Sequence, residues 1–133
     1  EDTLENIHQR IAARLMRLPL LILLLSVLAP AVWAGPFDGR YRPDTPGGES
    51  WDCKTIGKDG GAILITSSLM FAVGSRCTLR DPKQVGGMDS TLYDAICRTD
   101  GAPWQRRVMI MKTETGVAVV QKGARISLLR KCE

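Results

Sequence analysis

From residue 35 onward, short apolar segments alternate with turn residues roughly every ten positions, and apolar residues do not recur at helical spacing. This rhythm is typical of an antiparallel β meander. The alternation is clearest where Leu69, Phe71 and Val73 share one face of an extended segment. We expect strands at 38–42, 51–56, 62–66, 69–73, in both arms of a hairpin between 77 and 97, and at 104–112, 117–121 and 125–132.

These segments amount to roughly seven to nine short strands in a single domain covering residues 35–133. The sequence therefore predicts an all-β fold, a small antiparallel meander closed as a barrel or a two-sheet sandwich, because either closure protects the edge strands. The main alternative is a helix within 117–130, which Ala118, Leu128 and Leu129 would tolerate.

The segment between Cys77 and Cys97 predicts a long β-hairpin with its turn at 86–89. If the two glycines at 86–87 alone formed the turn, Cys77 would face Ile96 and the two cysteines would lie on opposite faces. A bond between the cysteines therefore requires an odd loop or a bulge. Pro82 lacks a backbone N–H, which places its arm at an edge or at a bulge.

All four cysteines, Cys53, Cys77, Cys97 and Cys132, follow residue 34. An even number of cysteines in a short exported chain favours disulfides over a metal site, and no C-x-x-C pair suggests zinc or thiol exchange. Four cysteines allow three pairings. We favour Cys77 with Cys97, which leaves Cys53 with Cys132, and a domain of about 100 residues benefits from both bonds because its core alone is marginal.

Residues 16–34 carry the pattern of a signal peptide. A basic residue, Arg17, precedes an aliphatic run at 20–29, and small residues at 32 and 34 suit signal peptidase. We expect an N-terminal apolar signal helix cleaved after Ala34, with localisation in the bacterial periplasm or secretion. The alternative is an uncleaved membrane anchor at 18–34, near the shortest length that spans about 30 Å of hydrocarbon. Residues 1–15 are expected to be an unstructured upstream extension.

Charge and chemistry exclude several functions. The net charge is +4, but the basic residues are dispersed and form only two doublets, which favours a solvated surface over a nucleic-acid site. The only histidine, His8, lies in the segment expected to be removed. Oxidised cysteines supply no thiolate, and Asp52, Asp94 and Asp100 suit turns or surface positions better than a catalytic pair. We therefore predict no enzyme, no cofactor and no metal site.

Aromatic residues with nearby arginines remain as candidates for contacting a ligand or partner: Tyr41, Trp51, Tyr93, Trp104, Arg106 and Arg107. Core packing is the alternative for the aromatic residues, and Met109 and Met111 are expected to fill the core. The leading hypothesis is a non-catalytic binding module for a protein or small ligand. The alternative is a structural or stress-related cell-envelope protein without a discrete site.

Several landmarks stand at defined distances along the chain: Gly39-Arg40-Tyr41, Trp51 two residues before Cys53, Tyr93 four before Cys97, Trp104 seven after it, and a terminal Arg130-Lys131-Cys132. In these landmarks the chain resembles small secreted four-cysteine proteins of Proteobacteria that have no established function. The resemblance implies localisation and architecture only. The Gly39-x-Tyr41 segment is more loosely similar to the glycine-x-tryptophan start of periplasmic lipocalin-like barrels, which include protease and lysozyme inhibitors. No inhibitory loop matches theirs.

Overall fold

A computed structural model of the chain describes residues 2–15 and 34–133, which fall in two units that we treat separately. Residues Asp2–Leu15 form helix α1, where the sequence analysis expected no regular structure. The segment lacks glycine and proline, and Leu4, Ile7 and Ile11 recur at helical spacing. The predicted signal helix falls on residues 16–33, outside the described residues. No helix in the described part is long and apolar enough to cross a membrane.

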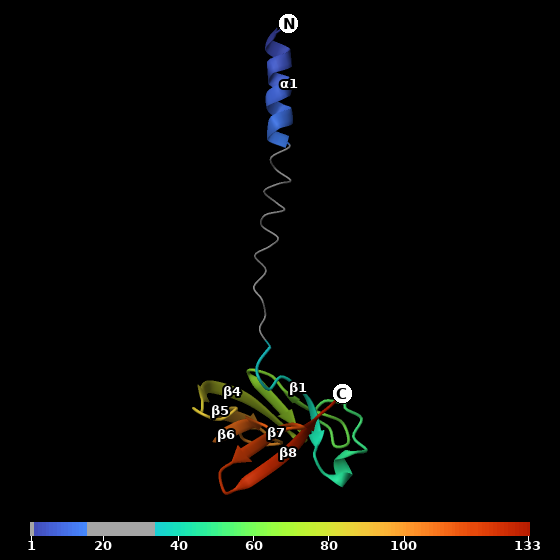
Figure 1. Ribbon diagram of the computed structural model, residues 1–133, viewed down its shortest axis with the longest axis vertical. Coiled ribbons are helices and arrows are strands. Elements are labelled where there is room, and N and C mark those ends of the chain that lie inside the picture. The colour runs from blue at the N-terminus through green and yellow to red at the C-terminus, as the bar shows by residue number, and fades with distance from the viewer. Residues whose placement is uncertain (1, 16–33) are drawn as a thin grey trace. The chain divides into compact units, whose positions relative to one another are not determined.

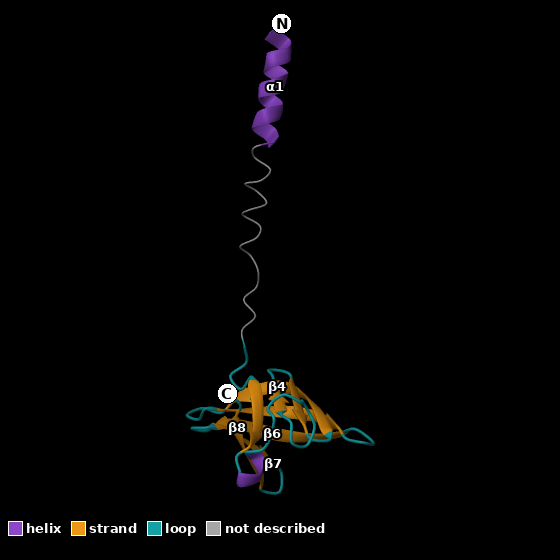
Figure 2. Ribbon diagram, turned by 90° about the vertical axis from the view of Figure 1, so that its right-hand side faces the viewer, coloured by secondary structure: helices purple, strands orange, loops and turns teal. Residues whose placement is uncertain are grey.

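Residues 34–133 form an eight-stranded closed barrel in which each strand pairs antiparallel with its neighbour in sequence (Figures 1 and 2). The barrel closes where β1 pairs with β8, with Tyr41 opposite Lys131. The prediction of an all-β meander is confirmed, and the barrel replaces the sandwich alternative. The strands are β1 Gly39–Pro43, β2 Ile63–Ile65, β3 Leu69–Ala72, β4 Ser75–Gln84, β5 Ser90–Arg98, β6 Trp104–Lys112, β7 Gly116–Gln121 and β8 Arg125–Lys131.

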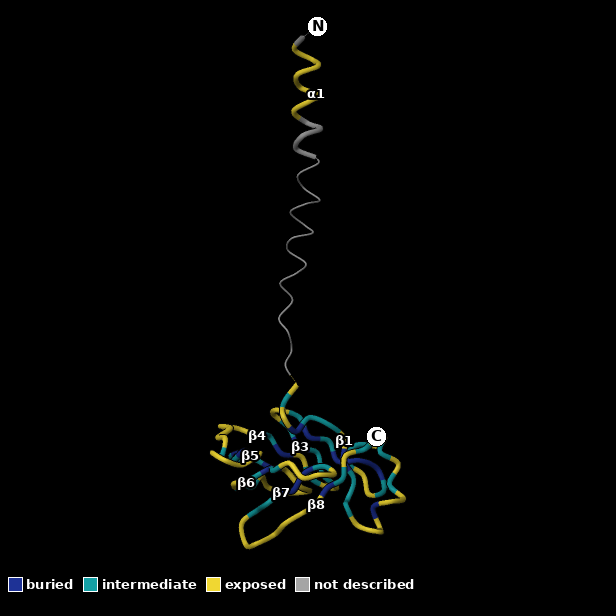
Figure 3. Tube along the Cα trace, viewed as in Figure 1, coloured by how far each residue is buried: buried dark blue, intermediate teal, exposed yellow. Residues whose placement is uncertain are grey.

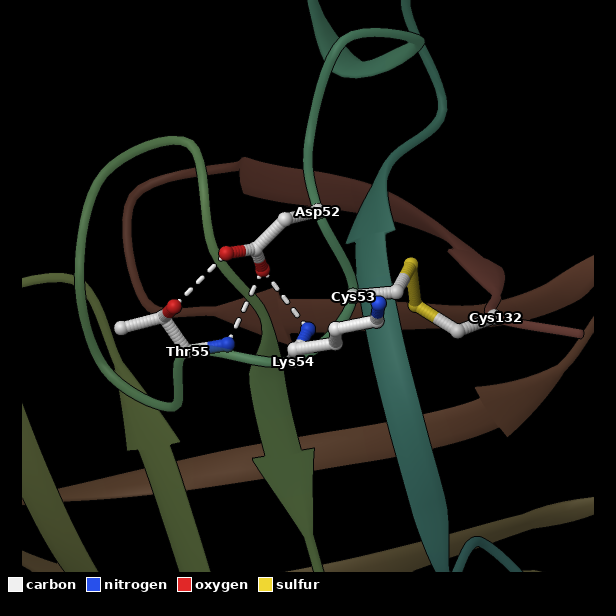
Figure 4. The surroundings of a disulfide bond; sticks show 5 residues. All are labelled: Asp52, Cys53, Lys54, Thr55 and Cys132. Carbon is white, nitrogen blue, oxygen red and sulfur yellow. Dashed lines mark hydrogen bonds between the residues drawn. A yellow bond between two sulfur atoms is a disulfide. The ribbon is translucent and has the colours of Figure 1, made fainter.

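The strand predicted at 51–56 is wrong. Residues 44–62 instead form a long connection with a 3-10 turn at Pro46–Gly48 and an isolated bridge at Ile56. Oδ1 of Asp52 accepts hydrogen bonds from the backbone N–H groups of Lys54 (2.7 Å) and Thr55 (2.9 Å) (Figure 4). Cys53 has φ 57°. This Asx-type turn takes the N–H groups that a strand would have used in its ladder.

The carboxylate of Asp52 is held in its ionised form. Its other oxygen, Oδ2, accepts a hydrogen bond from the Thr55 hydroxyl at 2.6 Å. That bond, followed by the two backbone N–H bonds, lowers the pKa of Asp52 to about 2. Asp52 therefore stabilises the turn that positions Cys53. These hydrogen bonds account for the lowered pKa of Asp52 without a second carboxylate nearby.

The β4–β5 hairpin is the longest in the barrel and contains the predicted disulfide between Cys77 and Cys97. The two cysteines face each other directly, with their Cα atoms 3.9 Å apart. The turn lies at 86–89 as predicted, because the Val85 N–H donates to the Ser90 carbonyl. The register shifts between residues 80 and 83, where two residues of β4 oppose one of β5. A bulge at Pro82 is thus what places Cys77 opposite Cys97. From the sequence, this pairing required either an odd loop or a bulge.

The second disulfide joins Cys53 to Cys132, with their Cα atoms 5.9 Å apart. It ties the connection after β1 to Cys132, the residue that follows β8. The backbone N–H of Cys132 also donates a hydrogen bond to the Arg40 carbonyl of β1 at 2.9 Å. Both favoured pairings are therefore present. Two such bonds indicate an oxidising environment.

The core lies inside the barrel (Figure 3). Buried residues alternate with less buried ones most regularly along β5, and β1, β3 and β8 each bury a single residue. On β6 the inward positions include Val108 and Ile110, whereas Met109 and Met111 lie half-buried on the outer face. The prediction that these methionines fill the core is wrong. They point away from the barrel interior, and in the described part of the chain no element other than the neighbouring strands β5 and β7 packs extensively against β6 to cover its outer face. The buried cluster comprises Phe37, Tyr41, Ile63, Ile65, Met70, Cys77, Leu79, Tyr93, Ala95, Cys97, Val108, Ile110, Val117, Val119 and Leu129.

Candidate functional site

A cavity of about 500 Å³ opens at the end of the barrel where β4 and β6 finish and β5 begins; we call it the mouth cavity. Its volume falls within the range of small-molecule sites. The residues that line it combine aromatic, proline and polar side chains: Pro36, Phe37, Ser67, Pro82, Gln84, Asp89, Ser90, Thr91, Tyr93 and Lys112.

Strand register places the polar residues of the mouth cavity. Thr91 and Tyr93 occupy successive inward positions of β5, and both are buried. Gln84 lies opposite Thr91 on β4, beyond the bulge. The bulge brings Gln84 to the same face as Thr91. Two residues of β4 oppose a single residue of β5, which shifts the alternation of β4 by one residue, and without this shift Gln84 would share the outer face of Arg80.

Phe37 contributes an apolar side chain just before β1. It is buried, with 4% of its surface exposed. The hydroxyl of Tyr41, four residues later, donates a hydrogen bond to the Phe37 carbonyl at 2.7 Å. This bond holds the segment that carries Phe37 against the barrel. It also gives the Tyr41 hydroxyl a partner, while the ring of Tyr41 packs in the core.

Both tyrosines at this end remain protonated at neutral pH. Burial raises the pKa of Tyr41, and the negative charge of Asp38 raises it further. Burial is also the main reason that the pKa of Tyr93 is raised; a hydrogen bond with Thr91 opposes the rise, and Asp38 adds to it. The Tyr93 hydroxyl therefore keeps its proton at the cavity wall and can donate it in a hydrogen bond.

Two polar atoms near this end are buried without a hydrogen-bond partner within the described residues: Oδ1 of Asp38 and Oγ of Ser90. Ser90 belongs to the cavity lining and is 2% exposed. An unpaired buried polar group costs about 1–3 kcal/mol, so such groups favour a bound partner that supplies the missing bond. The charged lining residues, Lys112 and Asp89, offset each other.

A second cavity of about 340 Å³ lies at the opposite end and is largely apolar, with Ile63, Met70 and Val119 among its lining residues. The nearby polar groups at this end are engaged with one another. Arg106 lies over the Trp104 ring, 3.7 Å from its centroid, and donates from Nη1 to Oε1 of Gln121 at 2.6 Å. This end therefore offers fewer free polar groups than the mouth cavity.

The candidate residues from the sequence do not form one site. Tyr93 lines the mouth cavity, and Tyr41 lies in the core with its hydroxyl bound to Phe37. Trp104 and Arg106 lie together at the opposite end of β6. Trp51 packs against the core from the long connection, and Arg107 is on the outer wall, where its Nε donates to Oδ1 of Asp94 at 3.0 Å.

Sequence reasoning missed Phe37, Gln84, Ser90 and Thr91. Period-two alternation from Tyr93 identifies Thr91 as an inward residue, so that signal was available. The inward direction of Gln84 depends on the bulge and on its cross-strand pairing with Thr91, and neither can be read from the residues next to Gln84 in the sequence.

Neither metal chemistry nor paired carboxylates are evident in the described residues. Residues 2–15 and 34–133 contain no group of three His, Cys, Asp or Glu side chains that could hold a metal ion. Asp94 is engaged by Arg107, and Asp44 is engaged by both Arg130 and Thr115.

No protein-family model, no curated protein and no solved structure matches this chain. The assignment of a function therefore depends on the cavity and its residues.

Proposed function

We propose that this chain is an exported, non-catalytic binding module that takes a small ligand into the mouth cavity. The observation that carries the proposal is the cavity of about 500 Å³ in which Phe37 and Tyr93 adjoin the polar side chains of Thr91 and Gln84. Apolar walls with a few convergent polar groups are the usual composition of a small-molecule site.

The lining indicates the chemistry of the ligand. Phe37, with Pro36 and Pro82, offers apolar contact, which favours a ligand with an apolar body. Tyr93 keeps its proton, and Gln84 can donate or accept. Because Lys112 and Asp89 balance each other at the rim, the cavity suits an uncharged ligand with a hydrogen-bonding group at one end.

Export is supported by two separate observations. The two disulfides require an oxidising compartment in which to form and persist. The signal-peptide pattern of residues 16–34 provides a route to that compartment. The resemblance to small secreted four-cysteine proteins agrees with both, and we assign the chain to the bacterial periplasm or to secretion.

A fluorescent probe tests the binding proposal. N-phenylnaphthylamine is uncharged and apolar, carries one N–H group, and fluoresces strongly outside water. We expect saturable binding to the oxidised protein, and loss of binding in Gln84→Trp, where an indole on an inward position fills the mouth. Lys83→Trp is the matched control, because the neighbouring residue points to the outer face opposite Leu92.

The control should bind the probe as well as the parent protein does. Equal binding by both tryptophan variants would place the probe elsewhere and contradict the proposed site. Absence of saturable binding in the parent protein would favour the alternative of a structural envelope protein without a discrete site.

A further inference from the structure

Four arginines that are far apart in the sequence gather on the outer wall of the barrel. Register places Arg76 directly opposite Arg98 across β4 and β5, and Arg80 opposite Asp94. Asp94 in turn lies beside Arg107 on β6. We call these residues the arginine cluster: Arg76, Arg80, Arg98 and Arg107. Along the sequence these arginines are dispersed, and the fold brings them together.

Little of the positive charge in this cluster is neutralised. Arg107 forms an ion pair with Asp94, but within the described residues Arg76, Arg80 and Arg98 form no salt bridge. Like charges directly opposite each other destabilise a sheet, so the Arg76–Arg98 pair costs the fold free energy. Arg76 is held over the Phe71 ring of β3, with its Cζ 4.7 Å from the centroid.

The cluster surrounds a hollow rather than a convex surface. A pocket of about 360 Å³ is lined by Thr78 and Ile96 together with Arg76, Arg80 and Arg98. Guanidinium groups around a hollow can bind carboxylates in the bidentate manner that arginine favours. The hollow is thus complementary to acidic side chains.

Beside the cluster, the outer face becomes apolar from β5 to β6 and continues around the barrel to β8. A first row crosses four adjacent strands through Leu92, Met109, Val120 and Ile126, which are consecutive partners in the register. A second row runs beside it through Met111, Ala118 and Leu128. Ile126 is 60% exposed and Leu128 is 53% exposed. The apolar residues nearest the arginines, Leu92, Met109 and Met111, are half-buried, and Ala118 is 4% exposed. A contiguous apolar patch marks an interaction site more often than scattered residues do.

We propose that this wall docks a partner protein whose contact surface is apolar with an acidic margin. Arginine and methionine are enriched in protein interfaces, and the wall presents both side by side. The arginines without a salt bridge in the described residues would bind acidic groups on the partner, and the two apolar rows would contact an apolar surface of the partner beside those groups.

Other occupants fit less well. A second copy that used the same face would bring arginines to the interface without free acids, because Asp94 is already paired with Arg107. Nucleic acid would leave the apolar rows uncovered. A lipid surface is usually contacted through Trp and Tyr, and neither row contains an aromatic residue.

Site-specific photo-crosslinking in the native host tests the docking. p-Benzoylphenylalanine is placed in the full chain at Ile96, inside the hollow, and as a control at Arg40, which lies on the outer face of β1 opposite Leu64. We expect one protein adduct that forms from position 96 and not from position 40. The purified partner should then bind the parent protein less tightly as ionic strength rises.

Charge removal gives the second measurement. Arg76→Gln combined with Arg98→Gln should weaken binding of the partner by about tenfold or more, because truncated interface arginines are frequent hot spots. The same double variant should unfold at a urea concentration close to that of the parent protein, because relief of the like-charge repulsion offsets the lost contact between Arg76 and the Phe71 ring. Unchanged unfolding would show that weaker binding is not misfolding. Gln84→Trp should leave partner binding unchanged, which separates this wall from the mouth cavity.

Three results would overturn the proposal. The first is the absence of an adduct from position 96, or equal adducts from both positions. The second is a partner whose affinity is insensitive to the arginine double variant. The third is arginine-dependent binding to phosphatidylglycerol vesicles or to double-stranded DNA in place of a protein.

Discussion

The disulfide between Cys53 and Cys132 makes a quantitative prediction about stability. Replacing both cysteines with alanine opens a closure of 79 residues in sequence. In the chain-entropy model, a loop of that size returns about 15 cal/mol/K to the unfolded chain, or about 4.5 kcal/mol at 25 °C. Both side chains are only half-buried, so their truncation removes little packing. The closing β1–β8 ladder remains, and the variant should still fold.

The other disulfide provides the comparison. Its closure spans 20 residues, for which the same model predicts about 3.3 kcal/mol. Cys77 and Cys97 are 1% and 0% exposed, however, so alanine at both positions also leaves space in the core. That loss adds about 1 kcal/mol or more, and the two double variants should lose similar stability for different reasons.

Urea unfolding, followed by tryptophan fluorescence and by circular dichroism, measures both effects. Cys53→Ala with Cys132→Ala should lower the free energy of unfolding by about 4 to 5 kcal/mol and steepen its dependence on urea, because the unfolded chain expands when the long closure is lost. A loss below about 2 kcal/mol would refute the reasoning. It would mean that the unfolded chain is already constrained near residue 53.

Three further predictions concern single residues. Ala124→Gly should raise the free energy of unfolding by about 1 kcal/mol in urea titrations, because Ala124 has φ 57°, and an unchanged value would contradict strain there. Tyr41→Phe should lower it by about 1–2 kcal/mol, since the Phe37 carbonyl loses its buried donor; a neutral result would show that the bond contributes nothing. Asp52 has a folded pKa of about 2 against an ordinary 3.8, so its contribution is present above about pH 4 and is lost as pH falls toward 2. Asp52→Asn should flatten that part of the acid-unfolding curve, and a curve identical to that of the parent protein would exclude the Asp52–Thr55 turn as its source.

Local pattern accounts for most of the strands. The segment 104–112 matches β6 because its alternating side chains need only neighbours on either side to define a face. The prediction of a strand at 51–56 was wrong because the Asp52 side chain accepts hydrogen bonds from the backbone N–H groups of Lys54 and Thr55, which a strand would have used. The β-branched and aromatic residues of the segment did not indicate this competition. Residues 2–15 form a helix in the absence of glycine and proline, although no core pattern demanded one.

The sequence by itself determined the all-β class and the turn at 86–89, because these depend on spacing along one chain. It favoured the cysteine pairing that the structure contains but left three pairings open. It also limited the arm that carries Pro82 to an edge or a bulge, because proline has no backbone N–H, and the structure contains the bulge. It could not determine which residues from different strands meet. That depends on register and closure, and these bring Gln84 to Thr91 at the mouth cavity and Arg76 to Arg98 on the outer wall. Only the tertiary structure decided both surfaces, because a one-residue change of register would turn each strand's side chains to the opposite face.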